Sequence, residues 1–344
     1  MSIIDKPNEY FNTVLYTGTG ATQSITGVNF TPDLTWIKGR SGATNHALYD
    51  VARGTTKDIG SNLDTAETTQ ATGLTTFGTD GFTVGALAKL NTSSATYSSW
   101  NWKAGGTAVS NTDGSITSSV SANTTAGFSI VSYATAVDWG AQTIGHGLGV
   151  VPKMIIAKNR DTAVYWTVYH ESMGNLVQIK LNTTEASVAS DSWNYTTPTS
   201  SVFSVGATTA NNEPNKNIIA YCFADVKGYS KFGSYTGNGS ADGTFVHLGF
   251  SASFFMLKRT DAVAGWTMFD NKRNTTYNPH IHWLIASANS AEDTDATGGI
   301  DFTANGVKIR SSFGSRNASG GTYIYMAFAE NPFVTSTGIP ATAR

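Results

Sequence analysis

Hydrophobic and polar residues alternate in short runs along the chain, and one arrangement of these runs occurs three times. In each copy an apolar run ends in a lysine, a polar loop follows, and a second apolar run ends in a polar residue. The copies cover residues 31–50, 151–170 and 251–270. Two short apolar runs that are joined by a polar loop predict the two strands of a β-hairpin.

The spacing inside these copies is constant. Twelve positions separate the lysine from the terminal polar residue in each copy: Lys38 and Asp50, Lys158 and His170, Lys258 and Asp270. Trp166 and Trp266 stand four residues before the end of their copies, and His46 takes that place in the first. A slip of one residue would exchange the buried and solvated faces of a strand. A folding requirement therefore explains the spacing more simply than an active site repeated three times.

Each copy continues into further short runs. Alternating aromatic or aliphatic residues close the copies at 97–102, 218–223 and 323–328, and such alternation is typical of half-buried strands. No apolar stripe with helical spacing exceeds two turns. The sequence therefore predicts an all-β fold with three tandem antiparallel β-sandwich modules.

The repeat also predicts the domain organisation. At 344 residues the chain is long enough for two or three domains. We expect modules at 1–105, 126–228 and 229–333. Residues 106–125, rich in Ser, Thr, Asn and Gly, are interpreted as a linker or a peripheral hairpin, and residues 334–344 as a polar C-terminal tail.

The composition favours an exterior β protein over a cytosolic enzyme. Charged residues make up 13% of the chain, about half the usual share, and Ser, Thr, Asn and Gly take their place. The net charge of −2, without any Lys/Arg run, argues against a nucleic-acid partner. The single cysteine, Cys222, is expected to be a small buried hydrophobe. Neither a signal peptide nor a membrane-spanning run is expected, so synthesis is predicted in the cytoplasm.

Residues with catalytic or metal-binding chemistry are sparse. His280 and His282 could present two imidazoles on one strand face with Asp270 nearby, but no further ligand follows at a recognisable spacing. A glycan hydrolase would need two carboxylates about 5–10 Å apart. Asp50 and Asp270 are candidates, yet His170 takes that place in the middle copy. We therefore expect no catalytic residue, metal or cofactor.

Carbohydrate binding needs aromatic faces with amides and hydroxyls beside them. Trp139, Trp193 and Trp283 lie outside the repeated apolar runs and are the candidate ligand-binding residues. The repeated lysines and aspartates predict cross-strand ion pairs, Lys38 with Asp50 and Lys258 with Asp270. An arginine follows each aspartate by three residues (Arg53 and Arg273) and is expected to share its carboxylate.

Several phrases of the sequence resemble tail-fibre-like virion proteins of marine bacteriophages. They are Tyr-Thr-Gly-x-Gly at 16–20, Trp-Ile-Lys at 36–38, Tyr-Asp-x-x-Arg-Gly at 49–54, Trp-Asn-Trp-Lys-Ala-Gly-Gly at 100–106 and Ile-Pro-Ala-Thr-Ala-Arg at 339–344. The likeness covers essentially the whole chain. The resemblance implies β-sandwich modules, often compared with concanavalin-like lectins, that are displayed on a virion, and it implies no established catalytic residue.

We therefore expect a non-enzymatic virion structural protein on the particle exterior, made in the host cytoplasm. It would act as a tail-fibre-like adhesin, receptor-binding or decoration module that binds host glycan. A purely structural capsid decoration protein and, in another class, a tailspike-type glycan hydrolase are the alternatives. The expected partners are other virion proteins and a host cell-surface glycan or protein. Exposed sheet edges and the symmetry of phage appendages favour a homotrimer, with a pseudo-trimeric monomer as the alternative.

Overall fold

The computed structural model describes residues 4–274, 278–330, 333–334 and 340–341. The prediction of an all-β fold is confirmed, because strands supply nearly all of the regular structure. No helix of the described residues is long and apolar enough to span a membrane. The helices have three or four residues each: η1 (Pro7–Glu9), α1 (Ala88–Asn91), η2 (Glu171–Met173), α2 (Thr209–Asn212) and α3 (Gly314–Asn317).

One order of four antiparallel strands occurs in the large sheet of each third of the chain. We call residues 4–105, 106–228 and 229–330 the first, middle and last thirds. The strand orders are β1-β9-β3-β4, β12-β19-β14-β15 and β20-β28-β22-β23. The bounds are β1 (Phe11–Thr17), β3 (Leu34–Gly39), β4 (Ala47–Asp50), β9 (Thr96–Trp102), β12 (Phe128–Ala134), β14 (Met154–Asn159), β15 (Thr167–His170), β19 (Asn217–Phe223), β20 (Ser230–Thr236), β22 (Ala252–Arg259), β23 (Thr267–Asp270) and β28 (Thr322–Ala329). The three hairpins expected from the repeat are β3–β4, β14–β15 and β22–β23.

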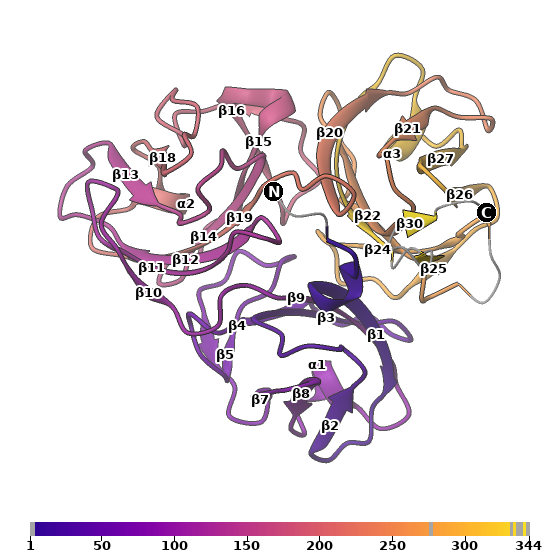
Figure 1. Ribbon diagram of the computed structural model, residues 1–344, viewed down its shortest axis with the longest axis horizontal. Helices are drawn as coiled ribbons and strands as arrows, with labels where there is room; N and C mark the ends of the chain where they lie inside the picture. Colours follow the sequence, from indigo (N-terminus) through magenta and orange to yellow (C-terminus); the bar gives the residue numbers. More distant parts are fainter. Residues whose placement is uncertain (1–3, 275–277, 331–332, 335–339, 342–344) are drawn as a thin grey trace.

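A smaller sheet packs on the outer face of each large sheet (Figure 1). Its strands are β2 (Gln23–Thr26), β8 (Gly81–Val84) and β7 (Leu74–Gly78) in the first third, β13 (Gln142–Gly145) and β18 (Val202–Val205) in the middle third, and β21 (Phe245–His247), β27 (Gly306–Ser311) and β26 (Gly298–Thr303) in the last. Successive side chains of a strand point to opposite faces. Ile37 therefore packs toward the small sheet, and Trp36 packs into a second core on the other side.

Most of the remaining strands extend the large sheets at their edges. Residues 106–125 are a hairpin rather than a free linker, because β10 (Val109–Asn111) and β11 (Ser118–Asn123) pair with each other and β11 pairs with β12. Most of the predicted tail, 334–344, lies outside the described residues. The other strands added to the large sheets are β16 (Gly174–Lys180), β17 (Val188–Ala189), β24 (His282–Ile285) and β25 (Asp293–Thr294). Separate two-stranded sheets are formed by β5 (Lys57–Asp58) with β6 (Thr68–Thr69) and by β29 (Phe333–Val334) with β30 (Pro340–Ala341).

The three large sheets face one another across a single shared core at the centre of the molecule (Figure 1). Trp102 of the first third has its ring centroid 6.3 Å from that of Phe223 in the middle third and 6.1 Å from that of Phe254 in the last. Phe11 stacks on Phe328 at 4.8 Å. Burying each such side chain contributes about 1.5–3 kcal/mol. A hydrophobic core therefore holds the three thirds together, as a hydrophobic core also holds the two sheets of each third together.

Hydrogen bonds of one kind close the ring of thirds at its three junctions, which we call first–middle, middle–last and last–first. The repeated position four residues before the end of each hairpin supplies the donor, and a main-chain carbonyl of the neighbouring third accepts. The bonds are Trp166 Nε1 to Gly60 O at 2.9 Å, Trp266 Nε1 to Lys180 O at 2.9 Å, and His46 Nε2 to Ile285 O at 3.0 Å.

Replacing Trp266 with Ala is expected to destabilise the protein by roughly 3–5 kcal/mol. The side chain is buried in the shared core and also makes the hydrogen bond across the middle–last junction. Chemical denaturation of both proteins measures the loss. A Trp139→Ala variant is the matched control, because Trp139 is 47% exposed and should change stability little. An unchanged unfolding midpoint for Trp266→Ala would contradict the shared core.

Candidate functional site

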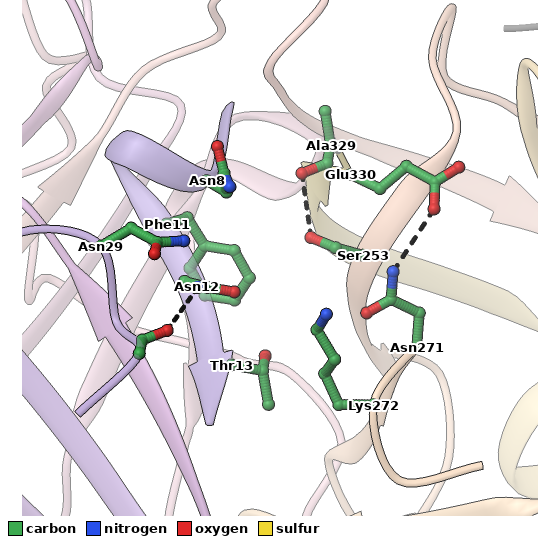
Figure 2. Close-up of a pocket in the computed structure, with 11 residues that line it drawn as sticks. Asn8, Phe11, Asn12, Thr13, Asn29, Ser253, Asn271, Lys272, Ala329 and Glu330 are labelled. Atoms are coloured by element: carbon green, nitrogen blue, oxygen red, sulfur yellow. Dashed lines mark hydrogen bonds between the residues drawn. The ribbon is translucent and has the colours of Figure 1, made fainter. Parts of the chain in front are cut away.

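A polar pocket of about 220 Å³ lies where the first and last thirds meet (Figure 2). Its walls come from η1, β1 and a turn on one side, and from β22, the residues after β23 and the end of β28 on the other. We call it the amide pocket, because four asparagines line it. The lining residues are Asn8, Phe11, Asn12, Thr13, Gly27, Asn29, Ser253, Asn271, Lys272, Ala329 and Glu330.

The wall from the first third is fixed by amide hydrogen bonds. Asn12 Nδ2 donates to Gly27 O at 3.1 Å, which ties β1 to the following turn. Asn29 adopts a positive φ of 72°, a conformation that asparagine tolerates better than most residues. Its N–H donates to Asp80 Oδ1 at 2.6 Å. Thr13, two residues from the start of β1, is buried beside these amides.

The wall from the last third follows from a turn at the end of β23. Asp270 Oδ1 accepts the N–H of Lys272 at 3.0 Å, so the chain turns and brings Asn271 and Lys272 to the pocket. Asn271 Nδ2 donates to Glu330 Oε2 at 3.4 Å. Ser253 Oγ donates to the carbonyl of residue 329 at 2.9 Å. Figure 2 shows the Lys272 side chain extending into the space between the two walls.

Two buried acceptors in the pocket have spare hydrogen-bonding capacity. Within the described part of the chain, Thr13 Oγ1 and Asn271 Oδ1 have no hydrogen-bond partner although both atoms are buried. A buried polar group without a partner typically costs about 1–3 kcal/mol. Together with the Lys272 ammonium, these groups can donate to and accept from a ligand with several hydroxyls.

The pocket exists because two short side chains replace an ion pair. The N–H of Asn271 donates to Ser253 O, and the N–H of Glu171 makes the same bond to Lys153 O in the middle third. These bonds make Ser253 and Asn271 the counterparts of Lys153 and Glu171. In the middle third the two long side chains pair with each other. Ser253 and Asn271 are shorter and leave room between the thirds.

Two of the three tryptophans expected to bind ligand are buried. Trp193 is 0% exposed and packs between the sheets of the middle third, with its ring 5.7 Å from Tyr169. Trp283 is 4% exposed, and the Arg316 guanidinium lies 3.8 Å from its ring centroid. Neither ring can offer a face to a surface ligand, so the predictions for Trp193 and Trp283 are wrong. Trp139 is exposed in a bend after β12, away from the residues that line the amide pocket.

The predicted ion pairs between the repeated lysines and aspartates are also wrong. Leu34, not Lys38, pairs with Asp50, and Phe254 pairs with Asp270, so lysine and aspartate lie at opposite ends of the hairpins. Each buried ammonium instead donates to main-chain carbonyls: Lys38 to Gly39 O at 2.7 Å, Lys158 to Asp64 O at 3.1 Å, and Lys258 to Thr184 O at 3.0 Å. Burial lowers the pKa of each of the three lysines to about 8.

The expected sharing of each aspartate with the arginine three residues later is found. Arg53 Nε lies 2.5 Å from Asp50 Oδ2, and Arg273 Nε lies 2.6 Å from Asp270 Oδ2. Burial would raise the pKa of Asp270, but Arg273 and further hydrogen bonds hold it below its usual value. One of those bonds crosses a junction, because Trp100 Nε1 donates to Asp270 Oδ2 at 3.0 Å. These carboxylates are structural anchors.

The histidines are held in separate settings. His170 is buried at the end of β15, and its Nε2 lies 3.1 Å from Tyr325 O. His280 packs against Phe302 with the two rings tilted and their centroids 4.5 Å apart, whereas His282 Nδ1 lies 3.1 Å from Glu292 Oε1. Across the described ranges, no group of three or more His, Cys, Asp or Glu side chains is arranged to hold a metal ion.

The sequence did contain a signal for the amide pocket that the repeat analysis missed. After the polar residue that ends each hairpin, the first copy has Val51 and the middle copy has Glu171, but the last has Asn271 followed by Lys272. All three copies differ at this position, and only the last places an amide and an ammonium side by side there. Asn12 and Thr13 lie in an ordinary alternating strand and carry no such signal.

Comparison with known sequences gives a family. A family model described as "Domain of unknown function (DUF7483)" matches residues 6–332. The chain belongs to this family. The match covers all three thirds, so the repeated hairpins and the junctions between them lie inside one family unit. No curated protein sequence matches the chain.

Proposed function

We propose that this DUF7483 protein is a non-enzymatic adhesin on the exterior of a bacteriophage virion and that its amide pocket binds host surface glycan. The lining of the pocket carries the proposal. Asparagine amides, the Thr13 hydroxyl and the Lys272 ammonium converge on one cavity, and two of its buried acceptors have no partner among the described residues. Few other ligand classes combine so many hydroxyl donors and acceptors on a small apolar frame.

The positions of the carboxylates support binding over hydrolysis. Asp50 and Asp270, the sequence candidates for a catalytic pair, are both buried and each is paired with an arginine. Glu330 is the one carboxylate among the described residues that line the amide pocket. Hydrolysis of a glycan by the usual mechanism needs two carboxylates across the scissile bond.

The proposed setting is the virion, with other virion proteins as partners and with neither nucleic acid nor membrane insertion. The low charge and the resemblance to tail-fibre-like proteins support it. We propose that residues 1–105, 126–228 and 229–333 each form one lectin-like β-sandwich module. The shared core supports the pseudo-trimeric monomer over a homotrimer, because the three large sheets already cover one another within one chain. Light scattering distinguishes one chain mass from three.

The test is binding and turnover on bacterial surface polysaccharides. We expect the purified protein to bind at least one capsular or lipopolysaccharide glycan on an array and to leave its size unchanged on chromatography. Thr13→Val removes an unpartnered hydroxyl at nearly constant volume, and Lys272→Gln removes the ammonium. Each should weaken binding by about tenfold, the usual value of one to two hydrogen bonds. Lys227→Gln, at an exposed lysine outside the pocket, is the matched control.

Two other results would replace the proposal. A fall in polysaccharide size that is abolished by Glu330→Gln would make the protein a glycan hydrolase. Failure of the wild-type protein to bind any glycan of the array, with labelling of the particle surface by an antibody, would leave a structural decoration protein.

A further inference from the structure

The three junctions share one main-chain hydrogen bond but differ in the side chains beside it. At each junction a main-chain N–H of one third donates to a main-chain carbonyl of the next third. The donor residues correspond to one another in the three copies, and so do the acceptor residues. The pairs are Glu67 with Arg160 at 2.8 Å, Ser187 with Thr260 at 2.9 Å, and Glu292 with Arg40 at 2.8 Å.

At two junctions an ion pair fills the space beside this bond. Arg160 donates to both oxygens of Glu67, at 3.0 and 2.9 Å, across the first–middle junction. Arg40 does the same to Glu292, at 2.9 and 2.8 Å, across the last–first junction. All four side chains are less than one-fifth exposed. The buried Arg53 and Arg273 back these glutamates at 3.2 and 3.3 Å.

At the middle–last junction every one of these charged side chains is replaced. Ser187 stands in place of the glutamate, Thr260 in place of the outer arginine, and Met173, three residues after His170, in place of the inner arginine. A groove of about 470 Å³ opens there, roughly twice the volume of the amide pocket. We call it the hydroxyl groove.

We propose that the hydroxyl groove is a second binding site and that it takes a neutral oligosaccharide chain. The proposal rests on the proposed function for the class of ligand only. The site itself follows from the comparison of the three junctions. The volume lies within the range of about 300–1,000 Å³ that is typical of ligand sites.

The chemistry of the lining selects an uncharged, polyhydroxylated ligand. Ser172, Ser187, Ser234, Thr236, Thr260 and Thr322 contribute hydroxyls, and none of the described residues that line the groove is charged. Thr260 Oγ1 and Thr322 Oγ1 lie 2.7 Å apart, so together they present a fixed hydroxyl pair.

The groove also has an apolar side for the C–H face of a sugar ring. Met173 and Val177 of the middle third are half-buried there and provide this side. Behind this wall Tyr235 and Tyr323 stack at 4.8 Å in the core of the last third and hold β20 against β28. A charged saccharide would gain no counter-charge in this lining and would lose part of its hydration.

The test restores the missing ion pair. Ser187→Glu/Thr260→Arg reproduces at this junction the pair that the protein already carries at the other two, and it should close the groove. Ser172→Trp blocks the rim at an exposed position and leaves the junction bond in place. Isothermal titration calorimetry would use soluble neutral oligosaccharides of glucose, galactose and mannose, with an oligogalacturonate as the acidic comparison.

We expect at least one neutral oligosaccharide to bind wild-type protein, with a loss of tenfold or more in both groove variants. Thr13→Val and Lys272→Gln should leave that binding unchanged. Binding that is lost in the amide-pocket variants but kept in both groove variants would overturn this inference and leave the proposed function standing. Failure of the wild-type protein to bind any of the neutral oligosaccharides would overturn it as well. The role of the amide pocket is judged separately, by the effect of Thr13→Val and Lys272→Gln on binding to the glycan array.

Discussion

Lowering the pH from 7 to 5 is expected to destabilise the protein by about 4 kcal/mol through two buried histidines. His46 accepts the Trp36 indole N–H on Nδ1 at 2.8 Å, and His170 accepts the Ser172 N–H on Nδ1 at 3.2 Å. Their Nε2 atoms face main-chain carbonyls across two junctions. Each ring therefore fits as the neutral form, with its one proton on Nε2.

The sign follows from the direction of the pKa shifts. Burial lowers the pKa of His46 to about 3, with a contribution from nearby Lys38, and lowers that of His170 to about 4. The unfolded chain keeps an ordinary histidine pKa near 6.5, so it binds more protons than the folded chain below that pH. The free energy of unfolding therefore falls as the pH drops from about 6.5 toward 4.

Urea unfolding at pH 7.0 and 5.0 measures this effect. Most carboxylates titrate below pH 5, so they contribute little to the difference. His46→Gln and His170→Gln keep one acceptor and one donor on each side chain but remove the titration. Each variant should lose a large part of the difference between the two pH values. His247→Gln, at an exposed position on β21, is the control. Equal pH dependence in all four proteins would show that the two buried rings do not titrate as described.

Removing the guanidinium of Arg273 is expected to cost about 3–5 kcal/mol, because it leaves the Asp270 carboxylate buried without its counter-charge. Both side chains are 0% exposed. Arg273 Nη2 also donates to Met268 O at 2.8 Å, so Arg273→Met leaves that carbonyl without its partner. Replacing both members of a buried pair removes the unpaired charge. Asp270→Asn/Arg273→Met should therefore be more stable than Arg273→Met alone.

Thermal unfolding of the two single variants and the double variant completes a double-mutant cycle. Arg259→Met is the matched control, because Arg259 pairs with Asp261 at the surface and such a pair is worth only about 0–1 kcal/mol. A loss at Arg273 no larger than the loss at Arg259 would contradict the burial of this pair. A double variant less stable than Arg273→Met would contradict the electrostatic cause.

The local pattern of the sequence predicted the strands and their hairpins well. The constant spacing from Lys38 to Asp50 does place β3 and β4 side by side, and the alternation in β9, β19 and β28 does separate two buried faces. Both features depend on neighbours in the chain. The period of a strand and the length of a loop are enough to specify them.

The contacts between thirds could not be predicted in this way. The sequence predicts Arg53 and Lys38 as partners of Asp50, but beside Arg53 the structure has the Tyr221 hydroxyl, 171 residues away, at 2.8 Å. Lys158 reaches the carbonyl of Asp64 in another third. A single strand can show that two of its faces are buried, but not which other segment buries the second face. The same limit hid Trp193 and Trp283, which pack beneath segments that are distant along the chain.

Both cavities lie at positions where the three copies differ in sequence. Asn271 at the last–first junction and Ser187 at the middle–last junction occupy positions where another copy has a long charged side chain. Comparison of the copies within one sequence can find such substitutions once the junction positions are known. The repeated spacing predicts the strands and hairpins, and the residues that differ between copies indicate where a ligand can fit.

Differential scanning calorimetry of the intact chain tests the central claim most directly, that the three thirds share one core and fold as one body. Trp102, Phe223 and Phe328 meet at the centre, so loosening any third exposes the other two. The account predicts a single transition, with a van't Hoff enthalpy equal to the calorimetric enthalpy. Two or three separate transitions, each with its own enthalpy, would mean that the thirds unfold independently and would contradict it.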